Sequence, residues 1–214
     1  MPPSAAQNDA ETYLAEDAVL VAARHRAAEV GVACIGSAGG AALRLLAAAV
    51  DARAVVEIGT GTGVSSVWLL RGMHSEGVLT TIDTEAEHQR LAREAFTEAG
   101  VGGARTRTIT GRAMDVLPRL ADASYDLVFC SALRAEYADY LGEALRLLRP
   151  GGVVVFDVTA SGGPPPAGRV ADAATREQAA GALAELTGSV RDNDRLISAL
   201  LPAGEGLLVA VLRG

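Results

Sequence analysis

Val55-Val-Glu-Ile-Gly-Thr-Gly-Thr-Gly-Val-Ser65 is the stretch of sequence that decides the fold. Its apolar beginning predicts a short buried strand over 53–58, and the three glycines then form a turn before a helix expected over 64–72. Glycine has no Cβ, so the backbone of the turn can adopt positive φ and approach a ligand closely. The helix directs free N–H groups and the positive end of its dipole to the same place. The stretch therefore predicts a site for a nucleotide-like ligand with an anionic group.

Strands and helices alternate along the rest of the chain, which predicts an α/β fold. The expected pattern is a Rossmann-like, doubly wound, mostly parallel seven-stranded sheet with N-terminal helices and a C-terminal antiparallel hairpin. Besides 53–58, we expect strands over 78–82, 105–109, 125–130, 153–157, 195–201 and 206–212. Besides 64–72, we expect helices over 85–99, 113–120, 135–148 and 170–187, and a mobile loop rich in Gly and Pro over 161–168.

The sequence predicts a single domain over 9–214 behind a disordered tail over 1–8. N-terminal helices occupy 9–50, and Ser37 is the expected N-cap of the last of them. The Rossmann-like core occupies 51–214. We find no apolar run long enough to span a bilayer and no signal peptide.

The composition narrows the class of protein. The formal net charge of −7 argues against a nucleic-acid-binding protein, which usually needs a basic face. The two cysteines, Cys34 and Cys130, lie far apart and are expected to be reduced thiols of a cytoplasmic protein.

Two residues distinguish the turn from the GxGxxG turn of dinucleotide-binding folds. The carboxylate of Glu57 would crowd a pyrophosphate but would suit an ammonium group, and Val64 occupies the place of the third glycine. Ser65 is a good donor to a carboxylate. Asp83, at the end of the second expected core strand, can accept the hydroxyls of a ribose or can cap the helix that follows it.

The order of these and later motifs resembles that of class I methyltransferases. More narrowly, the chain from about residue 33 onward is similar to the catechol/caffeoyl-CoA-type O-methyltransferases and their bacterial relatives. The motifs are Glu57-Ile-Gly-Thr-Gly-Thr-Gly63, Thr81-Ile-Asp83, Gly111-Arg-Ala-Met-Asp-Val-Leu117, Tyr125-Asp-Leu-Val-Phe129, Leu148-Arg-Pro-Gly-Gly152 and Leu201-Pro-Ala-Gly-Glu-Gly-Leu207.

The resemblance implies that the chain binds S-adenosyl-L-methionine. It implies that Glu57 holds the methionine amino group directly or through water, that Ser65 contacts the carboxylate, and that Asp83 holds the ribose. The other residues implied at the donor site are Ile35 beside the methionine, Gly59, Thr60, Gly61 and Gly63 around the ligand, Ala113 and Met114 beside the adenine, and Ser131.

The metal site of the resembled family is degraded in this sequence. That family binds a divalent cation through carboxylates, but the stretch Phe129-Cys-Ser-Ala-Leu-Arg134 has Ser131 and Leu133 in place of two aspartates. The later Asp-Asn pair reads Asp157-Val158. Hard cations prefer several oxygen ligands, so we expect no divalent metal.

The catalytic candidates are Arg134 and Asp157. Arg134 stands in place of the family's general-base lysine, and a guanidinium group keeps its proton at neutral pH. It could instead stabilise a phenolate or bind a carboxylated acceptor. Asp157 is the remaining candidate base, and a purely structural role for it, capping a nearby loop, is an equal alternative.

The favoured function is O-methylation of a small molecule without a divalent metal, by a chain that forms a homodimer. The first alternative is a tRNA methyltransferase of the hydroxyuridine type, whose basic rim would consist of Arg105, Arg107, Arg112 and Arg134. The second is a non-catalytic protein that binds S-adenosyl-L-methionine. A nicotinamide-dependent oxidoreductase is disfavoured by Glu57 and Val64.

Overall fold

The computed structural model describes residues 5–158, 173–204 and 206–214. Its strands are β1 (Ala54–Ile58), β2 (Val78–Asp83), β3 (Thr106–Thr110), β4 (Tyr125–Cys130), β5 (Leu148–Asp157), β6 (Leu196–Leu201) and β7 (Leu207–Leu212). Its α-helices are α1 (Ala5–Tyr13), α2 (Ala18–Glu29), α3 (Ser37–Ala49), α4 (Val64–Gly72), α5 (Ala86–Glu98), α6 (Ala113–Val116), α7 (Tyr137–Leu147) and α8 (Ala173–Arg191). Short 3₁₀ turns occupy Gly103–Arg105, Leu117–Arg119 and Arg134–Glu136.

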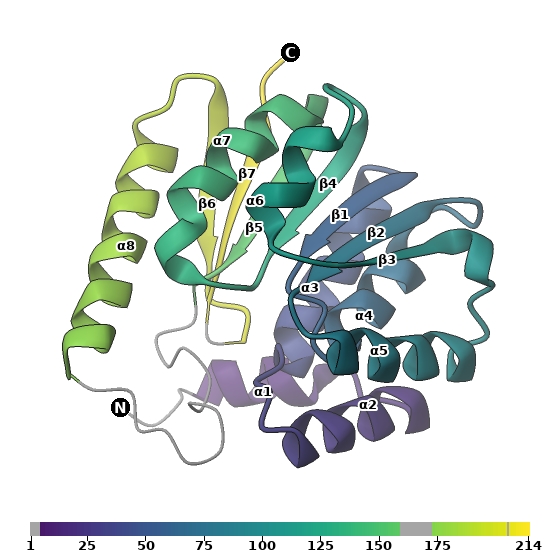
Figure 1. Cartoon of the computed structure of the whole chain (residues 1–214). Coiled ribbons are helices and arrows are strands. Elements are labelled where there is room, and N and C mark those ends of the chain that lie inside the picture. Colours follow the sequence, from purple (N-terminus) through teal and green to yellow (C-terminus); the bar gives the residue numbers. More distant parts are fainter. Residues whose placement is uncertain (1–4, 159–172, 205) are drawn as a thin grey trace.

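The seven strands form one sheet in the order β3-β2-β1-β4-β5-β7-β6. β1 to β5 pair in parallel, whereas β7 is antiparallel to both β5 and β6. Helices α1 to α5 lie on one side of the sheet and α6, α7 and α8 on the other (Figure 1). This arrangement confirms the expected Rossmann-like sheet with its C-terminal hairpin.

The apolar core has one part on each face of the sheet. Leu43, Trp68, Leu79 and Phe129 belong to the cluster beneath α3, α4 and α5. Ile58 and other residues belong to the second cluster, which is covered by α6, α7 and α8. Alternate side chains of the same strands supply the two clusters, and this is why the strands read as continuous apolar runs.

The predicted boundaries are exact for α4 and β4 and differ elsewhere for identifiable reasons. The helix expected over 113–120 stops at Val116 and becomes a 3₁₀ turn because Pro118 has no N–H to donate. The helix expected over 135–148 ends at Leu147, and β5 begins earlier than predicted because Leu148 pairs with Tyr125.

Two predictions about the N-terminal region are wrong. Residues 5–8, which the sequence assigned to a disordered tail, belong to α1. Ser37 is the first residue of α3 and not its N-cap, which is Gly36. A side chain from α1 serves instead, because the Glu11 carboxylate accepts the N–H of Ala38 at 3.2 Å. Such a cap between distant segments has no local sequence signature.

The loop expected over 161–168 lies outside the described residues. Across the part of the chain that the structure describes, no helix combines the length and the apolar character needed to cross a membrane.

Candidate active site

A cavity of about 670 Å³ opens at the C-terminal ends of β1 to β4. β1 pairs with β2 on one side and with β4 on the other, so the chain leaves β1 in the place where the strand order reverses. Ligands of open α/β sheets bind in the crevice at this switch point. The glycine turn after β1 and the first residues of α4 form part of the cavity wall, as the sequence predicted.

The three glycines of the turn all have positive φ, at +96° for Gly59, +50° for Gly61 and +89° for Gly63. At Gly59 the reason is contact within the fold, because a Cβ there would lie 2.4 Å from the carbonyl oxygen of Ser131. A Cβ at Gly63 would press against Ala92 of α5. Gly59 and Gly61 line the cavity, but Gly63 does not.

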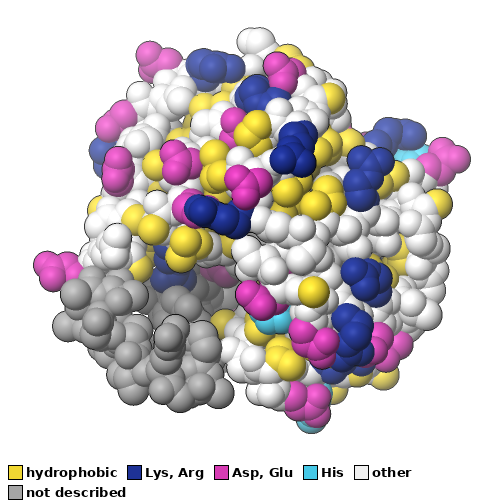
Figure 2. Space-filling model, viewed as in Figure 1, with side chains coloured by type: hydrophobic (Ala, Val, Ile, Leu, Met, Phe, Trp, Pro, Cys, Tyr) yellow, Lys and Arg dark blue, Asp and Glu magenta, His cyan; other side chains and the backbone are white. Residues whose placement is uncertain are grey.

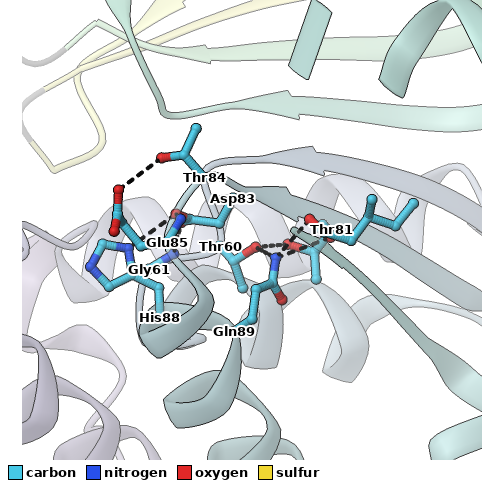
Figure 3. A network of polar contacts seen from close by, with 9 residues as sticks. Thr60, Gly61, Thr81, Asp83, Thr84, Glu85, His88 and Gln89 are labelled. Atoms are coloured by element: carbon cyan, nitrogen blue, oxygen red, sulfur yellow. Dashed lines mark hydrogen bonds and ion pairs between the residues drawn. The ribbon is translucent and has the colours of Figure 1, made fainter. Parts of the chain in front are cut away.

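Asp83 ties the end of β2 to the glycine turn (Figure 3). Its Oδ2 accepts the backbone N–H of Gly61 at 2.9 Å, and its Oδ1 accepts the N–H of Glu85 at 3.0 Å. The ring of His88 also lies at Oδ1, with Nδ1 at 3.1 Å. The N-cap of α5 is Glu85, so Asp83 braces two turns and does not cap the helix.

A buried polar network lies behind the turn (Figure 3). The hydroxyl oxygens of Thr60 and Thr81 are 2.6 Å apart. The side-chain amide of Gln89 donates to the Thr60 hydroxyl at 2.9 Å and to the carbonyl of Ile109 at 3.2 Å. Hydrogen bonds of this kind satisfy polar groups that would be costly to bury alone. They hold β1, β2, β3 and α5 in register beneath the cavity.

Glu57 extends this network and is fully buried. Its carboxylate accepts the hydroxyls of Ser65 and Thr81, each at 2.6 Å, and that of Ser66. Burial raises the pKa of Glu57 to about 7 even though the three hydroxyl donors favour the charged form. Glu57 is not among the residues that line the cavity, whereas its partner Ser65 is. The family resemblance implied that Glu57 contacts the ligand directly or through water.

The two catalytic candidates lie beside the cavity and do not line it. The hydroxyl of Ser131, which does line it, donates to Oδ2 of the half-buried Asp157 at 3.3 Å. The backbone carbonyl of Asp157 accepts the hydroxyl of Tyr137 at 2.9 Å. Arg134 begins the 3₁₀ turn that leads into α7.

Asp157 and Ser131 do not make a cation site of the resembled kind. One carboxylate and one hydroxyl fall short of the oxygen ligands that a hard cation requires. Among the described residues, no group of three or more His, Cys, Asp or Glu side chains could hold a metal. The residues present therefore do not fit the divalent cation, and we derive no step through one.

The family model described as O-methyltransferase matches residues 5–213. The chain belongs to this O-methyltransferase family.

Relatives of this O-methyltransferase family member cover nearly its whole length. A protein of Mycolicibacterium vanbaalenii, assigned by its name to the O-methyltransferases, is 51% identical over 95% of this chain and 88% of its own. The O-methyltransferase TomG of Streptomyces achromogenes, solved with S-adenosyl-L-methionine, is 27% identical over 97% of this chain and 95% of its own, with a TM-score of 0.79. The Bacillus cereus O-methyltransferase, solved with S-adenosyl-L-homocysteine, is 25% identical over 97% and 96%, with a TM-score of 0.81.

Most of the donor-site residues expected for the O-methyltransferase come together in the cavity. Those that line it are Ile35, Gly59, Thr60, Gly61, Ser65, Asp83, Ala113 and Ser131. The expected donor-site residues that do not line it are Glu57, Gly63 and Met114, and neither catalytic candidate, Arg134 or Asp157, lines it.

The sequence analysis named Arg112 only in a possible basic rim and did not predict its grouping with Glu136 and Tyr140 at the cavity wall. The Glu136 carboxylate accepts a hydrogen bond from Nη2 of Arg112 at 2.9 Å and another from the Tyr140 hydroxyl at 2.7 Å. The spacing of four residues between Glu136 and Tyr140 is a helical signal that could have linked those two. His88 and the segment 32–34 were also missed, and no motif marks them.

Proposed function

We propose that this O-methyltransferase transfers the methyl group of S-adenosyl-L-methionine to an oxygen atom of a small molecule. The observation that carries the proposal is the cavity at the switch point, because it combines the glycine turn, the first turn of α4 and the carboxylate of Asp83. A helix N-terminus suits the methionine carboxylate and an acidic strand end suits a ribose. The donor and its product are the ligands named for the Streptomyces and Bacillus structures.

In this proposal, each residue of the site contacts a particular part of the methyl donor. Asp83 accepts ribose hydroxyls, the backbone N–H of Ser65 in the first turn of α4 donates to the methionine carboxylate, and Ile35 lies along the methionine chain. Thr60 and the turn glycines Gly59, Gly61 and Gly63 enclose the ligand, and Ala113 and Met114 flank the adenine, with Ser131 nearby. Glu57 does not touch the donor in this proposal, because it accepts the Ser65 hydroxyl and so holds Ser65 in place at the start of α4.

The bound donor supplies an electrophilic methyl group on a sulfonium ion. The acceptor oxygen attacks this carbon as the carbon–sulfur bond breaks, giving a methyl ether or ester and the thioether product. The protein has to align the two molecules and exclude water, because in-line transfer depends chiefly on proximity and orientation. The acceptor proton leaves to a base, which we propose to be Asp157.

Asp157 is the candidate because its carboxylate, at the end of β5, accepts the hydroxyl of Ser131, which lines the cavity. The sequence contains no lysine, so all 19 of its basic side chains other than histidine are arginines that keep their protons. Arg134, in the 3₁₀ turn that follows Ser131, is suited to hold an anionic acceptor or phenolate. We propose that the reaction needs no divalent metal, because Ser131 replaces the carboxylate that would hold one.

Calorimetric titration with S-adenosyl-L-homocysteine, once in EDTA and once in Mg²⁺, tests the proposal. We expect micromolar or tighter binding that is equal in both buffers. Absence of binding in both would overturn the donor assignment. Product formation from a panel of phenols, catechols and hydroxy acids, measured in EDTA, would then test the acceptor class.

We further propose that the acceptor is a small molecule, that the chain forms a homodimer, and that it works in the cytoplasm. On the face shown in Figure 2, arginine and acidic side chains are interspersed, which supports a small-molecule acceptor over a polyanion. β6 is an edge strand of the described sheet and carries the exposed Ile197 and Leu200, which supports self-association through this edge. Light scattering coupled to size-exclusion chromatography would measure the oligomeric state directly.

A further inference from the structure

One wall of the cavity is a stretch of chain without helix or strand. Residues 32–35, in the connection between α2 and α3, contribute Val32, Ala33, Cys34 and Ile35 to the lining. This connection joins the separate helices α2 and α3 (Figure 1), and none of its residues pairs with a strand of the sheet. Irregular segments are the least stable parts of a fold, and a binding wall made from one needs side chains to hold it.

The side chain of Arg24, in α2, donates hydrogen bonds to two residues of this wall. Its Nη2 donates to the backbone carbonyl of Ile35 at 2.9 Å, and its Nη1 donates to the sulfur of Cys34 at 3.1 Å. Both acceptors belong to residues that line the cavity. Two adjacent wall residues are thus held by one guanidinium group.

Glu16, in the linker between α1 and α2, fixes the orientation of Arg24. The Glu16 carboxylate accepts hydrogen bonds from Nε of Arg24 at 2.9 Å and from Nη2 of Arg24 at 2.5 Å, so the pairing is bidentate. The Glu16 side chain is only 9% exposed. Burial acts to raise the pKa of Glu16, but Arg24, through its hydrogen bonds and charge, together with Ser37 and Trp68, outweighs burial and lowers the pKa overall. The pair therefore stays charged at neutral pH and holds the guanidinium plane in one position.

We infer that Arg24, oriented by Glu16, is a positioning residue that sets the wall at 32–35 for the methyl donor. This inference rests on the proposed function, since Ile35 is the residue proposed to lie along the methionine chain. Arg24 itself does not line the cavity, so it acts through Cys34 and Ile35. Lysine cannot replace it, because one ammonium group cannot bridge a carboxylate, a carbonyl and a thiol with fixed geometry.

The same helix provides a matched control. Arg26 also makes a two-pronged pair, with Glu98 of α5 at 3.0 and 2.8 Å, and contacts no residue of the wall in any hydrogen bond of the described chain. Arg24→Lys and Arg26→Lys therefore each replace a two-pronged guanidinium pair on α2 by an ammonium group, and only the first removes hydrogen bonds to the cavity wall.

The experiment compares binding of S-adenosyl-L-homocysteine and steady-state kinetics in Arg24→Lys and Arg26→Lys. We expect Kd to rise about tenfold in Arg24→Lys and less than twofold in Arg26→Lys. The KM for the donor should rise with Kd, whereas the KM for the acceptor should stay within twofold. Thermal unfolding of both variants separates loss of stability from loss of positioning.

Glu16→Gln covers the case in which Arg24→Lys does not fold, because it keeps the shape of the pair and weakens its hold on Arg24. It should raise Kd by a factor between those of Arg24→Lys and Arg26→Lys. Equal Kd values for the Arg24, Arg26 and Glu16 variants would overturn the inference. Failure of the unmodified chain to bind would instead overturn the proposed function, so the two failures are distinguishable.

Discussion

The carboxylate of Asp83 accepts the backbone N–H of Gly61 at 2.9 Å, and this contact joins the end of β2 to the turn that follows β1. Asp83 also accepts the N–H of Glu85 and lies against the ring of His88. One side chain thus shapes the wall of the cavity and presents an acidic group to it. A substitution of Asp83 should therefore affect both the shape of the cavity wall and the binding of a ligand in the cavity.

Asp83→Asn should weaken binding of S-adenosyl-L-homocysteine by tenfold or more. The amide removes the charge that a ribose hydroxyl would donate to, and its NH₂ group faces N–H donors that Asp83 accepts. Calorimetric titration measures the loss. Asp192→Asn, on an exposed side chain of the C-terminal region, is the control and should leave Kd unchanged. Unaltered binding in Asp83→Asn would show that the ribose lies elsewhere.

Gly59→Ala should destabilise the fold by about 2–4 kcal/mol, because it combines a positive φ with a clash against backbone. The added Cβ would lie 2.4 Å from the carbonyl oxygen of Ser131. Gly102→Ala is the matched control, since Gly102 has φ of −64° and a Cβ there meets nothing within 4 Å. Urea denaturation should show Gly102→Ala to be neutral or slightly stabilising. Similar unfolding free energies for the two variants would contradict the close approach of β1 and β4.

Glu57 should make the unfolding free energy fall as the pH rises. Its pKa is about 7 in the folded chain against an ordinary value of 4.5, so the folded state binds the proton more tightly than the unfolded state. Its contribution is therefore fully present below pH about 4.5 and is lost as the pH rises through about 7, a change on the order of 3 kcal/mol.

Glu57→Gln should remove this slope, which urea denaturation between about pH 4 and about pH 8 would detect, because that range spans both the ordinary and the folded pKa. Glu76→Gln, on an exposed residue, should leave it in place. A slope that survives Glu57→Gln would assign the pH dependence to another group.

Ser131→Asp should create Mg²⁺ binding that the unmodified chain lacks. The Ser131 hydroxyl lies 3.3 Å from Oδ2 of Asp157, so a carboxylate introduced there would share a cation with Asp157. Titration with Mg²⁺ alone should give heat in Ser131→Asp and none in the unmodified chain or in Ser131→Asn. Turnover of the unmodified chain should persist in EDTA; its loss, with recovery on adding Mg²⁺, would refute the metal-free proposal.

Local patterns predicted the elements whose signals are contained in one short stretch. α4 and β4 begin and end where the sequence placed them, because a glycine turn and a run of apolar residues mark their ends. The early end of α6 was foreseeable from Pro118, whereas the pairing of Leu148 with Tyr125 depends on the neighbouring strand. Ser37 had the chemistry of an N-cap, but Glu11 took the role from another helix.

The sequence by itself determined the sheet, the switch-point site and the glycine turn that forms part of its wall, because strand periodicity and the glycine turn are local properties of the chain. Only the tertiary structure decided the place of Glu57, which the motif directed to the ligand and which three hydroxyl groups hold below the cavity. It also decided that Arg24 supports the wall at Ile35, eleven residues away. Contacts between separate elements depend on how those elements pack, and no spacing along the chain encodes that packing.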